Sequence, residues 1–362
     1  MPCRRALCYL AFAATFGLFC YGQPLKTAGV MAEQRAGHTA TLLPNGNVLI
    51  TGGFKKAADG WSQTYFSSAE LYDPAKHSFS ATGSMTYRRC GHTATLLKNG
   101  LVLIAGGVAD MGVLSSAELY NPAAGTFIPI NSMRARRCDF TATLLADGRV
   151  LMCGGGSRDA LATAEIFNPS TKLFTATGEM TAPRLAHTAS LLPDGDVLIT
   201  GGSSRRYVVL ATAELYTPAT GEFHGVGDME QPRYKHAAAG IEGGPVLILG
   251  GSTKDDWRGT LSAMERYDPA QRTFSRVPNL LHARFKMPQA VVNLRNGTVL
   301  VAGGDSTLEL VDPSTGESRI VASLGTPRYY GTATVLQNGE VLIAGGYDNK
   351  LRCTNKTWLY SK

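Results

Sequence analysis

The chain has 362 residues, of which 44% are apolar and 17% charged, with a net charge of +7. Its 41 glycines and 17 prolines are spread along the chain, and so many turn-forming residues favour an all-β fold with a large core. The modest positive charge contains no Lys/Arg tract, which argues against nucleic-acid binding.

The first 22 residues have the pattern of a secretory signal peptide. Arg4 and Arg5 precede an uncharged apolar run at residues 6–19, which is shorter than the about 20 residues that a membrane span needs. Lipid attachment at Cys20 is disfavoured because bulky Phe19 precedes it. We therefore predict a signal peptide at residues 1–22, no membrane span, and a secreted or periplasmic protein at residues 23–362.

A Gly-Gly pair then recurs seven times, at intervals of about 49 residues. Each pair follows an apolar run such as residues 48–50, and each run follows a tight-turn pair such as Asn45-Gly46. A short apolar run between turn signals predicts a buried strand. The first glycines of the pairs are Gly52, Gly106, Gly154, Gly201, Gly250, Gly303 and Gly345.

Each repeat contains four predicted strands, which in the first repeat lie at residues 38–43, 48–51, 69–72 and 79–83. Four antiparallel strands in each of seven repeats predict a seven-bladed β-propeller. The predicted blades cover about residues 35–83, 88–130, 136–178, 184–227, 233–277, 284–321 and 328–361.

The last repeat ends after its third strand, at residues 357–360, and lacks an outer strand. Residues 24–30 align with the outer strand of the first repeat. We therefore predict that residues 24–30 form the outer strand of the seventh blade. Both ends of the chain would then close the ring within one sheet and leave no exposed seam.

The repeats resemble the kelch family of β-propellers, most closely exported bacterial kelch proteins and the central domain of galactose oxidase. They share the patterns R-x-x-H-T-A-T-L-L, as at residues 89–97, and A-E-L-Y-x-P, as at residues 117–122. The resemblance covers residues 25–360 and implies the fold, but it carries little information about function.

An arginine opens every repeat, and six repeats carry a glutamate in the third strand. Because lone buried charges are costly, we expect structural Arg–Glu pairs in preference to an anion-binding ring. Trp358 takes the glutamate position in the seventh repeat, so Arg328 is expected to be less constrained. The arginines are Arg35, Arg89, Arg137, Arg184, Arg233, Arg284 and Arg328, and the glutamates are Glu70, Glu118, Glu165, Glu214, Glu265 and Glu309.

Four histidines follow the arginine by three residues, at His38, His92, His187 and His236. They lie on different repeats, so we predict hydrogen bonds within each blade and no metal site. Cys90 and Cys138 share one position on neighbouring repeats, where the predicted separation is too long for a disulfide. Cys153 precedes a Gly-Gly pair and is expected to be buried and inert.

We place the ligand-binding face where the loop before strand one meets the loop after strand two. The kelch resemblance implies that partners bind there, and loops on a rigid scaffold commonly carry binding sites. The loops of blades four to seven are rich in aromatic and basic residues, which are typical of recognition. The candidates are Asp139, Arg158, Asp159, Arg205, Arg206, Tyr207, Lys235, Lys254, Asp255, Trp257, Lys286, Asp305, Tyr329, Tyr330, Tyr347 and Asp348.

We expect a monomeric binding module for a protein segment or a carbohydrate or anionic ligand, without cofactor, metal or assigned catalytic residue. A copper oxidase resembling galactose oxidase would need a Tyr-His dipeptide, and the nearest sequence is Tyr234-Lys235-His236. An enzyme resembling sialic acid mutarotase, a six-bladed propeller, would need an acid and a base that converge. The pairs considered are Asp139 with Arg158 and Asp305 with Lys286.

Overall fold

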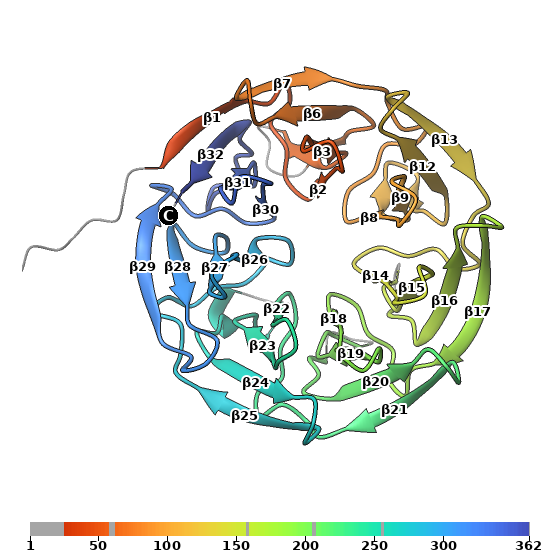
Figure 1. Ribbon diagram of the computed structural model, residues 1–362, viewed down its shortest axis with the longest axis vertical. Helices are drawn as coiled ribbons and strands as arrows, with labels where there is room; N and C mark the ends of the chain where they lie inside the picture. The colour runs from red at the N-terminus through yellow and green to blue at the C-terminus, as the bar shows by residue number, and fades with distance from the viewer. Residues whose placement is uncertain (1–24, 58–61, 157–158, 205–207, 255–256, 362) are drawn as a thin grey trace, which may run out of the picture.

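The computed structural model describes residues 25–57, 62–156, 159–204, 208–254 and 257–361. Seven four-stranded antiparallel sheets form a ring around a central axis (Figure 1), which confirms the predicted seven-bladed propeller. Among these residues, no helix has the length and apolarity that crossing a membrane requires. The predicted signal peptide lies outside the described residues.

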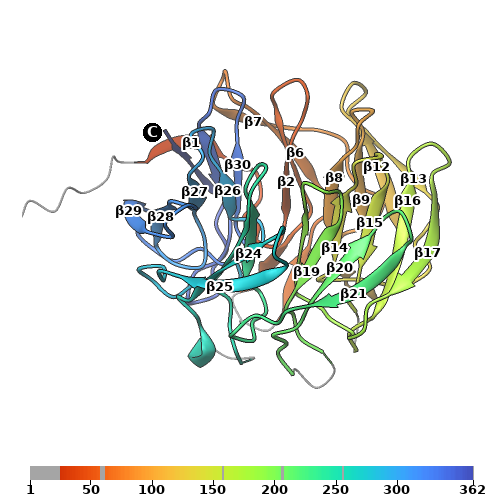
Figure 2. The same ribbon diagram turned by 60° about the horizontal axis from the view of Figure 1, so that its bottom comes forward.

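Each blade runs from an inner strand at the axis to an outer strand at the rim, as β15, β16 and β17 show (Figure 2). The inner strands are β2 (Thr39–Leu42), β8 (Thr93–Leu96), β14 (Thr141–Leu144), β18 (Thr188–Leu191), β22 (Ala237–Gly240), β26 (Val291–Asn293) and β30 (Thr332–Val335). The second strands are β3 (Val48–Thr51), β9 (Val102–Ala105), β15 (Val150–Cys153), β19 (Val197–Thr200), β23 (Val246–Leu249), β27 (Val299–Val301) and β31 (Val341–Ala344).

The third and fourth strands complete each blade. The third strands are β6 (Ala69–Asp73), β12 (Ala117–Asn121), β16 (Thr163–Asn168), β20 (Ala213–Thr217), β24 (Met264–Asp268), β28 (Thr307–Val311) and β32 (Lys356–Tyr360). The outer strands are β7 (Ser78–Ala81), β13 (Thr126–Ile130), β17 (Leu173–Glu179), β21 (Glu222–Val226), β25 (Thr273–Val277), β29 (Ser318–Ser323) and β1 (Lys26–Val30).

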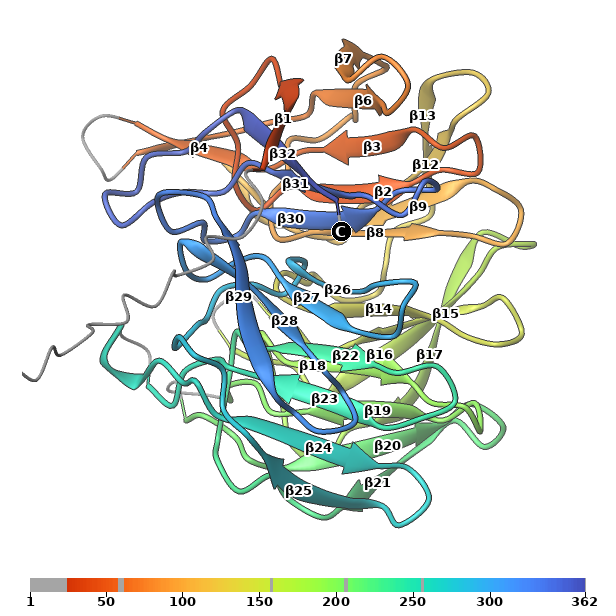
Figure 3. The ribbon, with the colours of Figure 1, turned by 60° about the vertical axis from the view of Figure 1, so that its left-hand side comes forward.

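Short elements extend the loops that follow the second strands. Strand β4 projects from one face of the ring (Figure 3). These elements are the hairpins β4 (Phe54–Lys56) with β5 (Gln63–Tyr65) and β10 (Val108–Ala109) with β11 (Gly112–Val113), and the 3₁₀ turn η2 (Trp257–Gly259).

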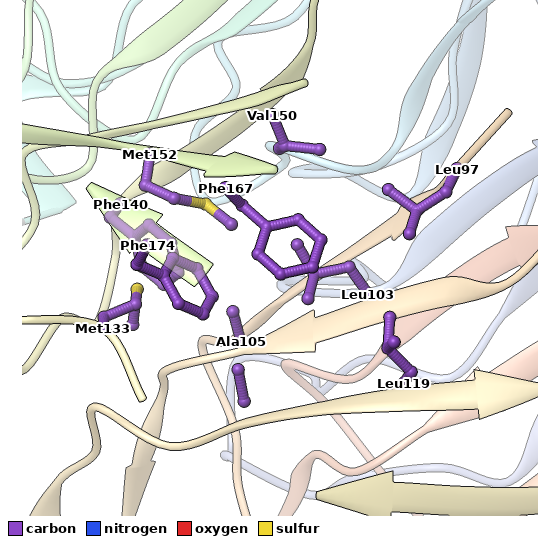
Figure 4. Close-up of a cluster of buried hydrophobic side chains, with 11 residues drawn as sticks. Leu97, Leu103, Ala105, Leu119, Met133, Phe140, Val150, Met152, Phe167 and Phe174 are labelled. Carbon is purple, nitrogen blue, oxygen red and sulfur yellow. The ribbon is translucent and has the colours of Figure 1, made fainter. Parts of the chain in front are cut away.

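The second strand of each blade is buried on both sides, because neighbouring blades cover both faces of the sheet. All four residues of Val48–Thr51 are buried, which explains why the sequence there is continuously apolar and does not alternate. The core accordingly lies between blades. In Figure 4, Leu103 and Leu119 of the second blade face Phe167 and Val150 of the third.

The seventh blade closes the ring as predicted. Strand β1 pairs antiparallel with β32, in the register Lys26 to Leu359 and Thr27 to Trp358, and the two strands lie side by side in Figure 1. The Met31 amide donates to the Asn355 carbonyl at 3.0 Å just beyond the strand. The closing sheet is therefore built from segments more than 300 residues apart in the sequence.

A buried ion pair lies inside each of six blades. In the second blade, Arg89 Nη2 lies 2.9 Å from Glu118 Oε1, and Arg89 Nη1 donates to the Gly106 and Ser116 carbonyls. Both side chains are almost fully excluded from solvent. The equivalent pairs are Arg35–Glu70, Arg137–Glu165, Arg184–Glu214, Arg233–Glu265 and Arg284–Glu309.

The backbone of the same arginine joins neighbouring blades. The Gly53 amide of the first blade donates to the Arg89 carbonyl of the second at 2.8 Å. A Cβ atom on the adjacent Gly52 would lie 2.5 Å from that carbonyl oxygen, closer than non-bonded atoms approach. The Gly-Gly pair is therefore required by the close contact between blades.

The recurring histidines do not form the hydrogen bonds within each blade that the sequence led us to expect. His92 Nε2 lies 3.2 Å from Thr39 Oγ1 and 3.1 Å from Thr51 Oγ1, both in the preceding blade. The same direction holds for His38 with Thr332, His187 with Thr141, and His236 with Thr188 and Thr200. The imidazole sits against the Gly-Gly pair of the preceding blade, so it joins blades and does not brace its own.

The cysteines form no disulfide among the described residues. Cys90, Cys138, Cys153 and Cys353 are all free, as expected for the pair on neighbouring blades. Cys153 is fully buried, and burial raises the pKa of its thiol to about 12. Such a thiol is a poor nucleophile at neutral pH.

The ion pairs predict a large loss of stability for Glu118→Gln. This change leaves the Arg89 guanidinium buried without a counter-charge, so the free energy of unfolding should fall by about 3 kcal/mol. The matched control is Glu230→Gln, whose partner Arg276 is exposed; its cost should stay below about 1 kcal/mol. Urea-induced unfolding measures both. Equal losses in the two variants would contradict the structural role of the buried pair.

The buried histidines predict that stability falls in mild acid. Burial, followed by Arg184, lowers the pKa of His187 to about 3, whereas the unfolded side chain titrates near about 6.5. At a pH between the folded and the unfolded pKa, the unfolded state binds a proton that the native state does not. The stabilisation is therefore complete above the unfolded pKa and declines by about 1.4 kcal/mol per pH unit towards the folded pKa.

The free energy of unfolding should depend less steeply on pH in His187→Gln, because the unfolded state of this variant binds about one proton fewer. The measurement is the slope of the unfolding free energy against pH between about 6 and 4. His224→Gln serves as the control, because His224 is exposed at the rim. An unchanged slope in the His187 variant would refute the assignment.

Candidate functional site

Seven residues, one from each blade, form a closed circle at one end of the axis. Each follows the blade arginine by two residues, and its amide donates to the carbonyl of the equivalent residue in the preceding blade, with N–O distances of 2.8–3.3 Å. The last bond, from Gly37 to Tyr330, closes the circle. We call this set the axial ring: Gly37, Gly91, Asp139, Ala186, Lys235, Lys286 and Tyr330.

Every residue of the axial ring has a left-handed backbone, with φ between 51° and 61°. Glycine adopts this conformation freely, but Asp139, Lys235 and Tyr330 adopt it at a cost of about 1 kcal/mol or more each. The ring of hydrogen bonds imposes the conformation on whatever residue occupies the position. Strain of this kind concentrates at sites where a side chain must be aimed.

The axial ring surrounds a cavity of about 110 Å³, which we call the mouth cavity. Asp139, Lys235 and Tyr330 line it, from the third, fifth and seventh blades, together with Gln289 and Thr93. A second space of about 400 Å³, lined by the inner strands, shares several of these residues and continues along the axis. The mouth cavity therefore brings together groups that lie far apart in the sequence.

Among the described residues that line the mouth cavity are one acid, Asp139, and one lysine, Lys235. Burial raises the pKa of the Asp139 carboxyl, and Lys235 opposes that shift. The Asp139 side chain lines the cavity and is exposed at its opening. Burial also raises the pKa of Tyr330 well above its ordinary value, so its phenol stays neutral and can donate a hydrogen bond.

Neutral histidines form part of the same wall. His38, His92, His187 and His236 line the mouth cavity, and burial lowers the pKa of each. Their uncharged rings contribute no positive charge near neutral pH. Within the part of the lining that the structure describes, Lys235 is therefore the positively charged side chain.

Aromatic residues gather on one side of the axial ring, where blades six, seven and one meet. Lys286 Nζ lies 3.0 Å from the Tyr347 hydroxyl and 4.8 Å from the centre of the Phe285 ring. Tyr329 packs against Phe285 and Tyr347 at centroid distances of 5.7 and 5.6 Å. Phe285, Tyr329 and Tyr347 are buried, so this cluster supports the ring and holds Lys286.

The loop before strand one meets the loop after strand two at the same end of the blade. In six blades an antiparallel bridge joins the residue after the arginine to the residue directly after Gly-Gly, as in Ala36 with Phe54 and Tyr234 with Ser252. Of the predicted residues, Asp139, Lys235 and Tyr330 line the mouth cavity. Lys286 is in the axial ring beside them.

The remaining predicted residues lie elsewhere. Asp305 pairs with His282 at 3.1 Å and accepts bonds from Thr307. Asp348 is buried, and its carboxylate binds Arg352 and closes a turn. Lys254 and Asp159 are exposed on the loops. Arg158, Arg205, Arg206, Tyr207 and Asp255 lie outside the described residues, as does the side chain of Trp257.

Sequence reasoning missed Pro288 and Gln289, which line both spaces on the axis. The signal was present, because Met287-Pro288-Gln289 replaces the His-Thr-Ala of the first, second and fourth repeats. Where the residue type departs from the repeat pattern, the residue does not serve the structural role that it has in the other repeats. Here it places an amide at the axis.

No family model matches the chain, and no curated protein matches its sequence. Among solved structures it is similar to one described as a "novel fungal alcohol oxidase with catalytic diversity among the AA5 family, in complex with copper". The two share 17% identity and a TM-score of 0.72, over 94% of this chain and 76% of that one. At this identity the likeness shows the fold alone.

The residues at the axis do not fit a copper site. No group of three or more His, Cys, Asp or Glu side chains with metal-binding geometry occurs within the described ranges. The four histidines nearest the axis direct Nε2 to threonine hydroxyls of four different blades. They therefore do not converge on one point, as ligands must.

The axial ring predicts opposite effects for two changes at Ala186. Ala186→Gly should raise the free energy of unfolding by about 0.5–1 kcal/mol, because glycine accepts a φ of 52° without strain. Ala186→Val should lower it by about 2 kcal/mol, because a β-branched residue resists that conformation. Thermal unfolding checks both signs, and shifts in the same direction would refute the imposed conformation.

Proposed function

We propose that the protein is an exported binding module of the kelch type, and that its ligand site is the mouth cavity. One observation carries the proposal: Asp139, Lys235 and Tyr330 reach one cavity from three blades that are not neighbours. The rigid axial ring holds their backbones in strained conformations, which supports a role in aiming side chains at a ligand.

The chemistry of the cavity favours a hydroxylated ligand with an acidic group, such as an acidic sugar. Lys235 supplies a cation for the acidic group, and Tyr330, Gln289 and Thr93 offer hydrogen bonds for hydroxyls. The cavity of about 110 Å³ holds one chemical group and not a long chain. The terminal unit of a glycan suits a cavity of this size. The alternative occupant is a side chain that protrudes from a protein segment.

A second candidate function is catalysis on such a sugar, by general acid–base chemistry. The raised pKa of Asp139 favours this function, because a carboxyl that titrates nearer neutrality can both donate and accept a proton. The neutral Tyr330 phenol could assist as a donor. Copper chemistry is not proposed, since the residues do not provide its ligands.

Binding to a glycan array containing acidic and neutral sugars tests the proposal. We expect retention of an acidic glycan, and a loss of about 10–100-fold in affinity for Lys235→Ala, because one charge-assisted hydrogen bond disappears. Tyr330→Phe and Asp139→Asn test the other two groups. Lys98→Ala is the control, since Lys98 lies on a turn between strands at the opposite end of its blade and contacts the Ala146 carbonyl.

Binding that survives Lys235→Ala unchanged would exclude the mouth cavity as the site. Conversion of the bound sugar to another anomer, abolished by Asp139→Asn, would replace the binding module by the enzyme. Stoichiometric copper together with oxidase activity on sugar alcohols would overturn both functions.

A further inference from the structure

The seventh blade lacks the ion pair that is present in the other six. Its arginine, Arg328, is nine-tenths buried, with 9% of its surface exposed, whereas the six paired arginines are 0% exposed. Within the described part of the chain Arg328 Nε makes no hydrogen bond, which is also true of four of the six paired arginines. Arg328 differs in its terminal nitrogens, which lack the carbonyl and carboxylate partners that Arg89 has. A buried guanidinium without an acceptor is costly, and such a group calls for an explanation.

The missing partner can be identified by register. In the second blade Ile104 pairs with Glu118, and in the seventh blade Ile343 pairs with Trp358 at the same place. Arg328 lies over the Trp358 ring, 5.3 Å from its centre. The face of the indole ring attracts the positive charge of the guanidinium. It does not replace the oxygen acceptors that the five N–H donors of a guanidinium require.

The glutamate also accepts a hydrogen bond from a backbone amide, and a serine at the end of β29 in the sixth blade replaces it in this contact. In the second blade the Thr86 amide donates to Glu118 Oε2 at 2.9 Å. The equivalent amide of the seventh blade, at Gly325, donates to Ser323 Oγ at 3.1 Å. Among the described residues, the loss of the glutamate thus leaves the arginine unpaired but not the Gly325 amide.

The charges nearby do not neutralise Arg328. Burial lowers the pKa of Arg328, Asp348 opposes this shift, and Arg352 adds to it. Asp348 already binds Arg352 through Nε and Nη2. The carboxylate near Arg328 is therefore already paired with another guanidinium.

We infer that Arg328 anchors a carboxylate-binding site in the seventh blade, in which the carboxylate of a ligand takes the place of the missing glutamate. The open 9% of the side chain gives a carboxylate access to the terminal nitrogens. A planar carboxylate matches the fork of the guanidinium. Arg328 does not line the mouth cavity, so this inference stands independently of the proposed function.

Thermal unfolding in sodium acetate and in sodium chloride of equal ionic strength tests the site with a carboxylate alone. At about five times the dissociation constant, acetate should raise the Tm of the wild-type protein by about 2 °C in a saturable way. Arg328→Gln should abolish the response. Trp358→Glu should restore the internal pair and abolish it too. Arg328→Lys, which keeps the charge, provides a second variant and should retain a weakened response.

Sodium glucuronate, tested on Lys235→Ala so that the mouth cavity does not contribute, distinguishes the source of the carboxylate. A larger saturable shift than that of acetate in this variant indicates an acidic sugar. Lys235→Ala should leave the acetate response intact, which separates this site from the mouth cavity. Equal Tm values of the wild type in acetate and chloride would overturn the inference. So would an acetate response that persists in Arg328→Gln or in Trp358→Glu.

Discussion

The arginine that opens each blade is the residue on which the ring depends. In six blades its side chain is buried against a glutamate and two carbonyls, so the desolvation of the charge is offset inside the blade. Its carbonyl meanwhile accepts a hydrogen bond from the Gly-Gly pair of the preceding blade. One residue thus sets the internal geometry of a blade and its distance from the next, and repetition of that unit sets the curvature of the ring.

The axial-ring position, two residues after the arginine, is also held in a fixed backbone conformation. Unlike the arginine position, it accepts different residue types. The backbone hydrogen bonds that close the axial ring do not depend on the side chain, so glycine, alanine, aspartate, lysine and tyrosine all occupy it. Positions of this kind allow the lining of the axis to change while the propeller stays intact. This explains how one fold can present different chemistry at its mouth.

Much of the fold was predictable, because the same sequence pattern recurs in seven repeats. The Gly-Gly spacing, the turn pairs and the missing last strand predicted the blades and the closure by β1. The Arg–Glu pairs were predictable from the cost of burying a lone charge. The sequence also grouped Asp139, Lys235, Lys286 and Tyr330 by register, as four of sixteen candidates.

The rest depended on contacts between blades, which a repeat pattern does not contain. A motif such as R-x-x-H shows that a histidine recurs, but not that its ring faces the preceding blade. Nor does residue type reveal a left-handed backbone at Lys235 or Tyr330, where neither residue prefers it. Asp305 and Asp348 resembled ligand-binding residues because they follow Gly-Gly, yet local hydrogen bonds hold their carboxylates in turns.

The pairing of β1 with β32 has a consequence for the order of folding. These strands are separated by more than 300 residues, so the entropy of closing that loop opposes their contact until the intervening blades have formed. The bond from Gly37 to Tyr330 joins the same two blades and must also form late. The mouth cavity is therefore completed in the last step, and a chain arrested before closure would have most of its sheets but no finished site.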